Sequence, residues 1–264
     1  MTDTFRTFTR ASFRRLSIAA VALLGASAAG AATLDVCASG CTYSSVATAI
    51  ASAASGDTVE LANQTFYEGG ITVDKSLTVR GLNMATIDAQ GHGWVFKVRS
   101  GHLVDFENLT LLGGTFARID NAGSLDLSNV QILGQGQTST MGGVLNRAAG
   151  SLWIGGNSVI ASNGSTFAGG GLSNYGDLVI TNTTVIGNHG KNGGGVWNRL
   201  GTVTVLASSF SFNTADHYGG AWANLTSGGA SGSVAFHGSA STSGNTATIN
   251  CDTSWDQATG ACVN

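Results

Sequence analysis

A short phrase of two glycines and a closing asparagine constrains this chain more than any other feature. It occurs four times, as GGVLN at 142–146, GGLSN at 170–174, GGVWN at 194–198 and GGAWAN at 219–224. The closing asparagines lie 28, 24 and 26 residues apart, which is far longer than a helical heptad. The repeat therefore predicts a solenoid, in which each coil buries its apolar face against its neighbours.

Apolar and polar residues alternate in the segments around this phrase. The alternating segments are 58–61, 76–80, 103–107, 124–128, 177–181 and 202–205. A period of two, bounded by Gly and Asn, is typical of strands with one buried face. We therefore expect an all-β fold, a right-handed single-stranded parallel β-helix of about seven coils with three short strands each.

Aligning the coils predicts three polar columns and one inward apolar column of stacked residues. The phase of the closing asparagines extends back to Asn121, Ser100 and Lys75, and the residues two before each form one inward column: Val73, Val98, Ile119, Val144, Leu172, Val196 and Trp222. Two further columns are Asn108, Asn129, Asn157 and Asn182, and Asn163, Asn188 and Asn213. We expect their side-chain amides to hydrogen-bond along the stack at the corners between strands.

The first 32 residues have the pattern of a secretory signal peptide. Four arginines precede an apolar run at 16–29, and an A-x-A type cleavage site follows. We expect an N-terminal cap at 33–57, the β-helix at 58–240 and a C-terminal cap at 241–264. The apolar run is shorter than the roughly 20 residues that cross a bilayer. No other segment approaches that length, so no transmembrane segment is expected after signal removal.

The charge of the chain argues against one class of partner. The formal net charge is -3, from 12 basic and 15 acidic residues. Removing 1–32 takes away four Arg and one Asp, which leaves 8 basic and 14 acidic residues and a net charge of about -6. An acidic chain of this kind is not expected to bind nucleic acid. The oligomeric state is left open by the sequence.

Both ends of the expected β-helix carry capping features. Residues 44–57 predict a short amphipathic helix with a serine N-cap, which Gly56 is placed to end. Four cysteines form two close pairs, Cys37 with Cys41 and Cys251 with Cys262. In an exported chain we expect two local disulfides, although four cysteines allow three connectivities. Zinc is the alternative, but no histidine lies near either pair.

The repeats also carry a family resemblance. With the phrase FSFN at 210–213, they resemble the passenger domains of polymorphic outer-membrane proteins, within the pectin-lyase-like group of parallel β-helices. The resemblance covers roughly 42–237. Together with the signal peptide, it leads us to expect an extracellular protein, with outer-membrane association or a periplasmic location as the other options.

Candidate catalytic residues follow from the enzymes of that group. A Gly-His-Gly turn at 91–93 is one of four polygalacturonase signatures, and in so glycine-rich a chain we interpret it as a turn. A calcium-dependent lyase needs a basic residue and stacked carboxylates. Strand alignment places Asp105 and Asp126 outward, about 4.8 Å apart, with Glu107 and Arg80 beside them. The alternative is a solvated charged face with an Arg80 to Glu107 ion pair.

A second set of candidates lies in the turns before the glycine phrases. Its members are His189, Lys191, Asp216 and His217. Aligned turns of a solenoid often bind ligands, and histidines with an aspartate suit a metal or a sugar, although His189 aligns nearer Ala215. Ordinary polar loop residues are the alternative. Trp153 and Trp197 are predicted to point outward, where indoles suit sugar stacking or a protein contact.

These features predict a secreted or surface-exposed binding protein more than an enzyme. A polysaccharide, another cell-surface component or a protein is the expected partner, and no cofactor is expected. The first alternative is a calcium-dependent polysaccharide lyase that acts on an acidic glycan. The second is a structural spacer, since nothing obliges a solenoid to bind a ligand.

Overall fold

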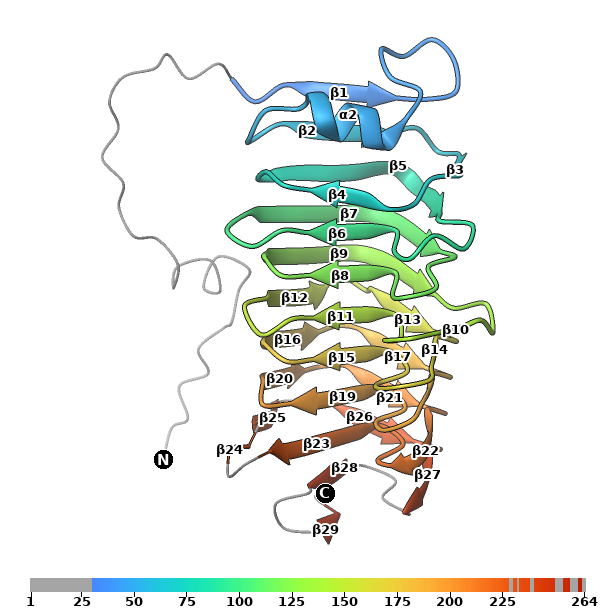
Figure 1. Cartoon of the computed structure of the whole chain (residues 1–264), viewed down its shortest axis with the longest axis vertical. Coiled ribbons are helices and arrows are strands. Elements are labelled where there is room, and N and C mark those ends of the chain that lie inside the picture. The colour runs from blue at the N-terminus through green and yellow to red at the C-terminus, as the bar shows by residue number, and fades with distance from the viewer. Residues whose placement is uncertain are drawn as a thin grey trace, which may run out of the picture. The chain divides into compact units, whose positions relative to one another are not determined.

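The computed structural model describes residues 30–227, 230–231, 233–237, 240–249, 254–256 and 261–262. This part of the chain is an all-β parallel solenoid of about eight turns, one more than predicted. Figure 1 shows the coils stacked one on another, with equivalent strands side by side. Among the described residues the strands form three sheets, of 14, 10 and 5 strands. The predicted fold class is confirmed.

In the middle coils the 14-stranded sheet supplies two successive strands, whereas the ten-stranded and five-stranded sheets supply one each. The 14-stranded sheet consists of β1 (Thr33–Val36), β2 (Thr58–Leu61), β3 (Thr65–Phe66), β5 (Leu77–Asp88), β7 (Leu103–Leu112), β9 (Ser124–Leu133), β12 (Ser151–Gly155), β13 (Val159–Ala161), β16 (Asp177–Thr181), β17 (Thr184–Ile186), β20 (Thr202–Leu206), β21 (Ser209–Ser211), β25 (Ser233–His237) and β26 (Ser241–Ser243). The ten-stranded sheet consists of β4 (Ile71–Val73), β6 (Phe96–Val98), β8 (Ile119–Asn121), β11 (Val144–Asn146), β15 (Leu172–Asn174), β19 (Val196–Arg199), β23 (Trp222–Ser227), β24 (Ala230–Ser231), β28 (Ser254–Asp256) and β29 (Ala261–Cys262). The five-stranded sheet consists of β10 (Thr138–Ser139), β14 (Gly164–Ser165), β18 (His189–Gly190), β22 (Thr214–Tyr218) and β27 (Thr246–Ile249).

Apolar side chains in register from coil to coil fill the interior. The inward column of the ten-stranded sheet includes Ile119, Val144, Leu172, Val196 and Trp222, all at most 1% exposed. Aromatic rings also pack across the interior, as between Phe210 and Trp222, whose centroids lie 4.5 Å apart. Burial of this column gives the coils their main cohesion, because each exposed apolar face would otherwise meet water.

The first two coils depart from the predicted phase by two residues. Phe96 pairs with Ile119, and Ile71 pairs with Phe96, so these two residues continue the inward column. Val98 instead lies opposite Asn121. The prediction that Ser100 and Lys75 belong to the asparagine column is therefore wrong. Valine occupies that column in the early coils, where the interior stays apolar.

Buried asparagines form a continuous ladder beside the ten-stranded sheet. The Nδ2 atoms of Asn121, Asn146, Asn174 and Asn198 each donate to Oδ1 of the next asparagine, at 2.9, 2.8, 2.8 and 2.9 Å, and the last of these acceptors is Asn224. Each amide also donates to a nearby backbone carbonyl, as Asn174 does to Gly176. Because a buried amide without partners is costly, this ladder fixes the register of the coils.

A second buried ladder explains the paired glycines. Asn163, Asn188 and Asn213 donate from Nδ2 to Oδ1 of the next asparagine, and Asn245 extends the series. A Cβ atom on Gly143 would lie 2.7 Å from the Gly171 carbonyl oxygen and 3.0 Å from the Asn163 amide carbon. The glycines therefore leave room for the ladder, which a side chain at that position would displace.

Arg118 occupies the equivalent position one coil before Gly143. Its backbone N–H donates to the Gly143 carbonyl, its side chain is fully buried, and Nη2 donates to the Gly134 carbonyl at 3.3 Å. Burial lowers the pKa of Arg118 to about 10, so the guanidinium stays charged at neutral pH. Nothing in the repeat predicted a buried cation here.

The remaining asparagine column lies at the corners between strands, as predicted, and its backbone conformation gives a further reason for asparagine. Asn108, Asn129, Asn157 and Asn182 all have left-handed backbone conformations, with φ between 46° and 65°. A side-chain bond along the stack joins Asn129 Nδ2 to Asn108 Oδ1 at 2.8 Å. The column marks the corner where the chain turns, because asparagine tolerates the left-handed region better than most residues.

A short helix covers the first coils, as predicted. Helix α2 (Val46–Ser52) begins after the N-cap Ser45, and Val46, Ala49 and Ile50 are buried. Glu68 accepts from the backbone N–H groups of Val46 and Ala47, while Lys75 Nζ donates to the Ala51 and Ala53 carbonyls. Opposite charges therefore complement both ends of the helix dipole. The helix ends at Ala53, before the predicted Gly56.

The two predicted caps differ in how far the structure describes them. Cys37 and Cys41 form the expected disulfide. Cys251 lies outside the described residues, as do 1–29 of the predicted signal peptide, so the pairing with Cys262 and the signal peptide stay predictions. The sheets extend into both predicted caps, since β1 pairs with β2 and β26 pairs with β21.

Replacing Asn188 with alanine tests the ladder. The change removes the acceptor of the Asn163 N–H and Nδ2 groups and the donor to the Ile160 carbonyl. We expect Asn188→Ala to lower the free energy of unfolding by about 3 kcal/mol, measured by urea denaturation. The control Asn192→Ala, at a half-exposed position, should cost less than about 0.5 kcal/mol. Equal losses would contradict a stabilising ladder.

Asp57 gives the N-terminal cap a defined dependence on pH. Its carboxylate accepts from the N–H groups of Ala32 and Ala54, each at 2.8 Å, and the bond from Ala32 is the larger cause of its lowered pKa. A depressed folded pKa stabilises the protein above the usual Asp pKa of about 3.9, and this stabilisation is lost as the pH falls through the folded value. We expect the free energy of unfolding of Asp57→Asn to fall less steeply as the pH is lowered in the acid range. Urea denaturation at several pH values measures this slope. An unchanged slope would contradict it.

Candidate functional site

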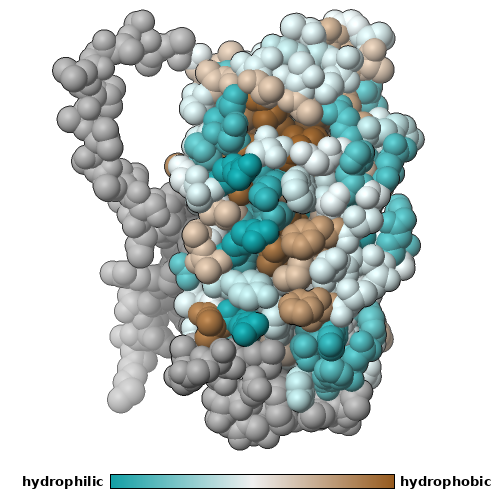
Figure 2. All heavy atoms as spheres, in the orientation of Figure 1, coloured by the Kyte–Doolittle hydropathy of each residue, from teal (hydrophilic) through white to brown (hydrophobic). Residues whose placement is uncertain are grey.

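The outer face of the ten-stranded sheet carries a cluster of large apolar side chains over β11, β15 and β19. We call this cluster the aromatic patch; its members are Phe116, Met141, Leu145, Phe167, Tyr175 and Trp197. Figure 2 shows apolar atoms gathered on this face, between hydrophilic side chains. Leu145 and Trp197 point outward from the sheet, and the other members come from the turns on either side of it. The patch is separate from the main interior core.

Trp197 is the most buried aromatic member of this patch. Its side chain points outward as predicted but is only 3% exposed. Phe167 and Tyr175 lie edge-on against the indole, with centroids 6.2 and 5.4 Å away. The prediction of an exposed indole at this position is wrong, because turns before and after the strand fold over it. Trp197 therefore forms the floor on which the more exposed rings are held.

A pocket of about 280 Å³ opens in the aromatic patch. Its lining residues are Phe116, Met141, Leu145, Arg147, Ala148 and Tyr175. Most of this lining is apolar, and Arg147 supplies the charge. A concave apolar surface with one fixed polar group is the usual form of a small-ligand site.

A buried carboxylate fixes the position of Arg147. Asp120 is 1% exposed, and it accepts from Arg147 through Nε to Oδ1 and through Nη2 to Oδ2, the latter at 2.9 Å. The hydrogen bond to Asp120 is the main cause of the raised pKa of Arg147. Lys97 Nζ lies 3.6 Å from Asp120 Oδ2. The guanidinium is therefore held by one edge, with Nη1 left for another group.

Positive charge surrounds this pocket although the chain as a whole is acidic. Desolvation raises the pKa of Tyr175, and the positive charges of Arg199 and Arg147 oppose this shift. Lys97 also lies 4.8 Å from the centroid of the Trp94 ring. Arg147, Arg199 and Lys97 thus outnumber Asp120, and the local field favours an anionic group.

The predicted carboxylate cluster is only partly assembled. Asp105 lies opposite Asp126 in neighbouring coils, and Arg80 lies opposite Glu107, as predicted. However, Asp126 is 4% exposed rather than solvated, and Arg80 forms its ion pair with Glu60, through Nε at 3.0 Å, instead of the predicted pair with Glu107. Within the described residues no group of three or more His, Cys, Asp or Glu side chains is placed to hold a metal ion.

The second predicted cluster forms a surface pair. His189 is in register with Thr214 rather than Ala215, its Nδ1 lies 2.9 Å from Thr214 Oγ1, and its Nε2 lies 3.2 Å from Asp216 Oδ1. The side chains of His189 and Asp216 are 51% and 56% exposed, so solvent screens their interaction. His217 donates its backbone N–H to the Lys191 carbonyl. These residues form no enclosed site.

Trp153 remains an outward-facing indole. It lies in register with Asp126 and Val179 on the 14-stranded sheet and is half-buried. Its ring lies over Gly155, where an added Cβ would come within 2.3 Å of the indole. This contact flattens the indole against the sheet, on a different side of the coil from the aromatic patch.

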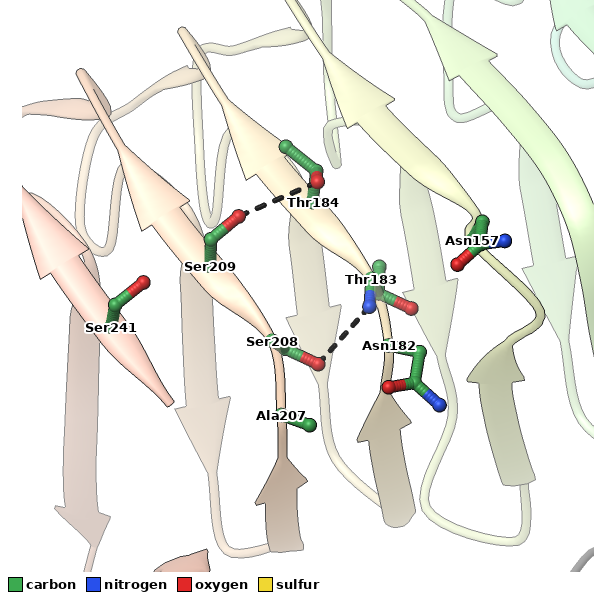
Figure 3. Close-up of a pocket in the computed structure, with 8 residues that line it drawn as sticks. All are labelled: Asn157, Asn182, Thr183, Thr184, Ala207, Ser208, Ser209 and Ser241. Carbon is green, nitrogen blue, oxygen red and sulfur yellow. Dashed lines mark hydrogen bonds between the residues drawn. The ribbon is translucent and has the colours of Figure 1, made fainter. Parts of the chain in front are cut away.

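A polar hollow lies at the corner between β16 and β17, and Figure 3 shows the side chains that line it. The lining consists of Asn157, Asn182, Thr183, Thr184, Ala207, Ser208, Ser209 and Ser241. The Thr183 and Ser208 hydroxyls donate to the Thr181 and Leu206 carbonyls, so their hydrogens already bond the backbone. The hollow begins where Ala207, with φ of 43°, takes the corner position that asparagine holds in earlier coils.

Restoring asparagine at this corner should stabilise the solenoid. Alanine in the left-handed region costs more than asparagine, so we expect Ala207→Asn to raise the free energy of unfolding by about 0.5–1 kcal/mol. Urea denaturation measures the change. Ala161→Asn, at a strand position outside the left-handed region, is the matched control and should not stabilise. A loss of stability in Ala207→Asn would mean that the corner has no room for the amide.

The sequence contained a signal for the pocket that its motifs did not reveal. Arg147, Tyr175 and Arg199 each follow a ladder asparagine directly, so they stack in neighbouring coils. Asp120 directly precedes the ladder residue Asn121. Inspection of the positions next to each ladder asparagine would have grouped these four residues.

Comparisons with protein-family models, with curated proteins and with solved structures found no match for this chain. In the part of the chain that the structure describes, no helix is long and apolar enough to cross a bilayer. The function proposed below is therefore built from the geometry and charge of the pocket residues.

Proposed function

We propose that this protein is a non-enzymatic binding protein whose ligand is an acidic carbohydrate. The observation that carries the proposal is Arg147, held in a fixed orientation by buried Asp120 at the edge of an apolar, aromatic-lined pocket. The apolar face of a sugar ring packs well on Phe116 and Tyr175. A carboxylate on that ring pairs with the remaining edge of the guanidinium.

Several features support an exported setting for this activity. The basic and apolar pattern at 1–32 favours export, and the Cys37–Cys41 disulfide suits an oxidising compartment. The β-solenoid is compatible with the resemblance to pectin-lyase-like proteins and polymorphic outer-membrane passenger domains, which remains a proposal. We expect the protein to bind a polysaccharide at or outside the cell surface.

The calcium-dependent lyase is the second candidate function, and it rests on one observation. Asp105 and Asp126 stack in neighbouring coils, where two carboxylates repel unless a proton or cation lies between them. Two features weaken this candidate: Asp126 is buried, and Arg80 is paired with Glu60.

Loss of the guanidinium should weaken binding. We expect Arg147→Met to reduce the affinity for the best acidic ligand on a glycan array by about 10- to 100-fold, since a charge-assisted bond contributes roughly 1.5–3 kcal/mol. Arg80→Met, on another face, is the matched control and should bind as the wild type does. Circular dichroism checks that both variants fold.

The same preparation separates the alternatives. Incubation with polygalacturonate and calcium, followed by ultraviolet absorbance of unsaturated product, detects lyase activity. Turnover that is lost in Asp105→Ala would overturn the binding proposal in favour of the lyase. If the protein shows no binding and no turnover, the structural spacer is favoured.

A further inference from the structure

A second and larger pocket lies at the turns between the long strands and the ten-stranded sheet. We call it the turn pocket; its volume is about 550 Å³, within the range of roughly 300–1,000 Å³ found for small-molecule sites. Its lining residues are Asp88, Gln90, Gly91, Gly113, Thr115, Gln135, Gly136, Gln137 and Thr138. Three successive coils contribute one turn each to this pocket.

The chemistry of the turn pocket suits an uncharged ligand rich in hydroxyl groups. Amides and hydroxyls dominate the lining, and among the described residues that form it there is no Lys, Arg or His. Asp88 is its one carboxylate, and Oδ1 accepts the backbone N–H of Gln90 at 2.9 Å. The other carboxylate oxygen is an acceptor for ligand hydroxyls. A ligand carboxylate would meet this negative charge with no cation to offset it.

The turn pocket and the pocket of the aromatic patch share two segments of chain. Thr115 lines the turn pocket, and the next residue, Phe116, lines the aromatic one. Likewise, Thr138 lines the turn pocket, and Met141 of the same segment lines the aromatic one. Backbone bonds join these segments, from Thr140 N to Thr115 O at 3.0 Å and from Met141 N to Phe116 O at 2.8 Å. The two pockets therefore adjoin along these two hydrogen-bonded segments.

We infer that the turn pocket is a second saccharide subsite, which takes a neutral unit of the same chain whose acidic unit binds at Arg147. The inference rests on the proposed function and goes beyond it, because it names the composition of the ligand. One pocket carries a fixed cation, Arg147, and its neighbour carries the carboxylate of Asp88. The preferred ligand is therefore a heteroglycan that links acidic and neutral units, and a homopolymer of uronate binds less well.

Titration calorimetry with two tetrasaccharides tests this inference. The first is a hyaluronan fragment, in which glucuronate alternates with N-acetylglucosamine, and the second is tetragalacturonate, in which every unit is acidic. We expect the wild type to bind the alternating fragment about tenfold more tightly, as one charge-assisted hydrogen bond allows. An Asp88→Asn substitution keeps the Oδ1 acceptor for Gln90 but removes the charge, and it should abolish most of this preference.

The control variant is Asp74→Asn, at an exposed carboxylate outside both pockets, and it should keep the wild-type preference. Thr138→Val, at an exposed position, is a second variant. It should lower the affinity for the alternating fragment and leave the affinity for tetragalacturonate unchanged. Equal affinity of the wild type for both probes, or a preference that Asp88→Asn leaves unchanged, would overturn the second subsite while leaving the binding function intact. If neither probe binds and no acidic glycan on the array binds, the binding function is overturned, and this inference with it.

Discussion

The buried asparagine ladders are the constraint on which the rest of this structure depends. A solenoid of apolar coils has many registers of similar hydrophobic energy, since one inward aliphatic side chain replaces another at little cost. An amide buried between coils has far fewer solutions, because its donors and acceptors must all find partners. Asn174, for example, bonds both Asn146 and Asn198. Such bonds select one stacking of the coils among the many that burial alone permits.

The candidate site is a consequence of that stacking. Arg147 and Tyr175 each follow a ladder asparagine, so fixing the ladder places them side by side on the outer face. Asp120 then receives two bonds from Arg147 across neighbouring coils. Only Asp120 of this ion pair is buried, so the pair is weak evidence for added stability, and we interpret it as a contact that orients the guanidinium. The scaffold thereby presents a rigid cation without any functional motif in the sequence.

Periodicity predicted the fold well because a repeat samples the same physical environment many times. The glycine phrases, the alternating strands and the asparagine columns all agreed with the structure. The early coils were misplaced by two residues because Val98 and Val73 occupy the asparagine column, and a valine there has no polar signature to align. The column that contains Asn157 lies at the predicted corners, and a bond along the stack joins Asn129 to Asn108. The sequence did not predict its left-handed backbone, because that conformation and a hydrogen-bonded amide both favour asparagine.

By itself, the sequence determined the coil length, the inward faces and the positions of the ladders, because these depend on local alternation and on a repeat that recurs along the chain. Only the tertiary structure decided which outward residues are accessible and which are paired. Trp197 is covered by rings from turns that lie 20 to 30 residues away, and Arg80 bonds Glu60 rather than Glu107. Exposure and ion pairing depend on the direction that each side chain takes toward the neighbouring coils, which the period of a repeat does not specify.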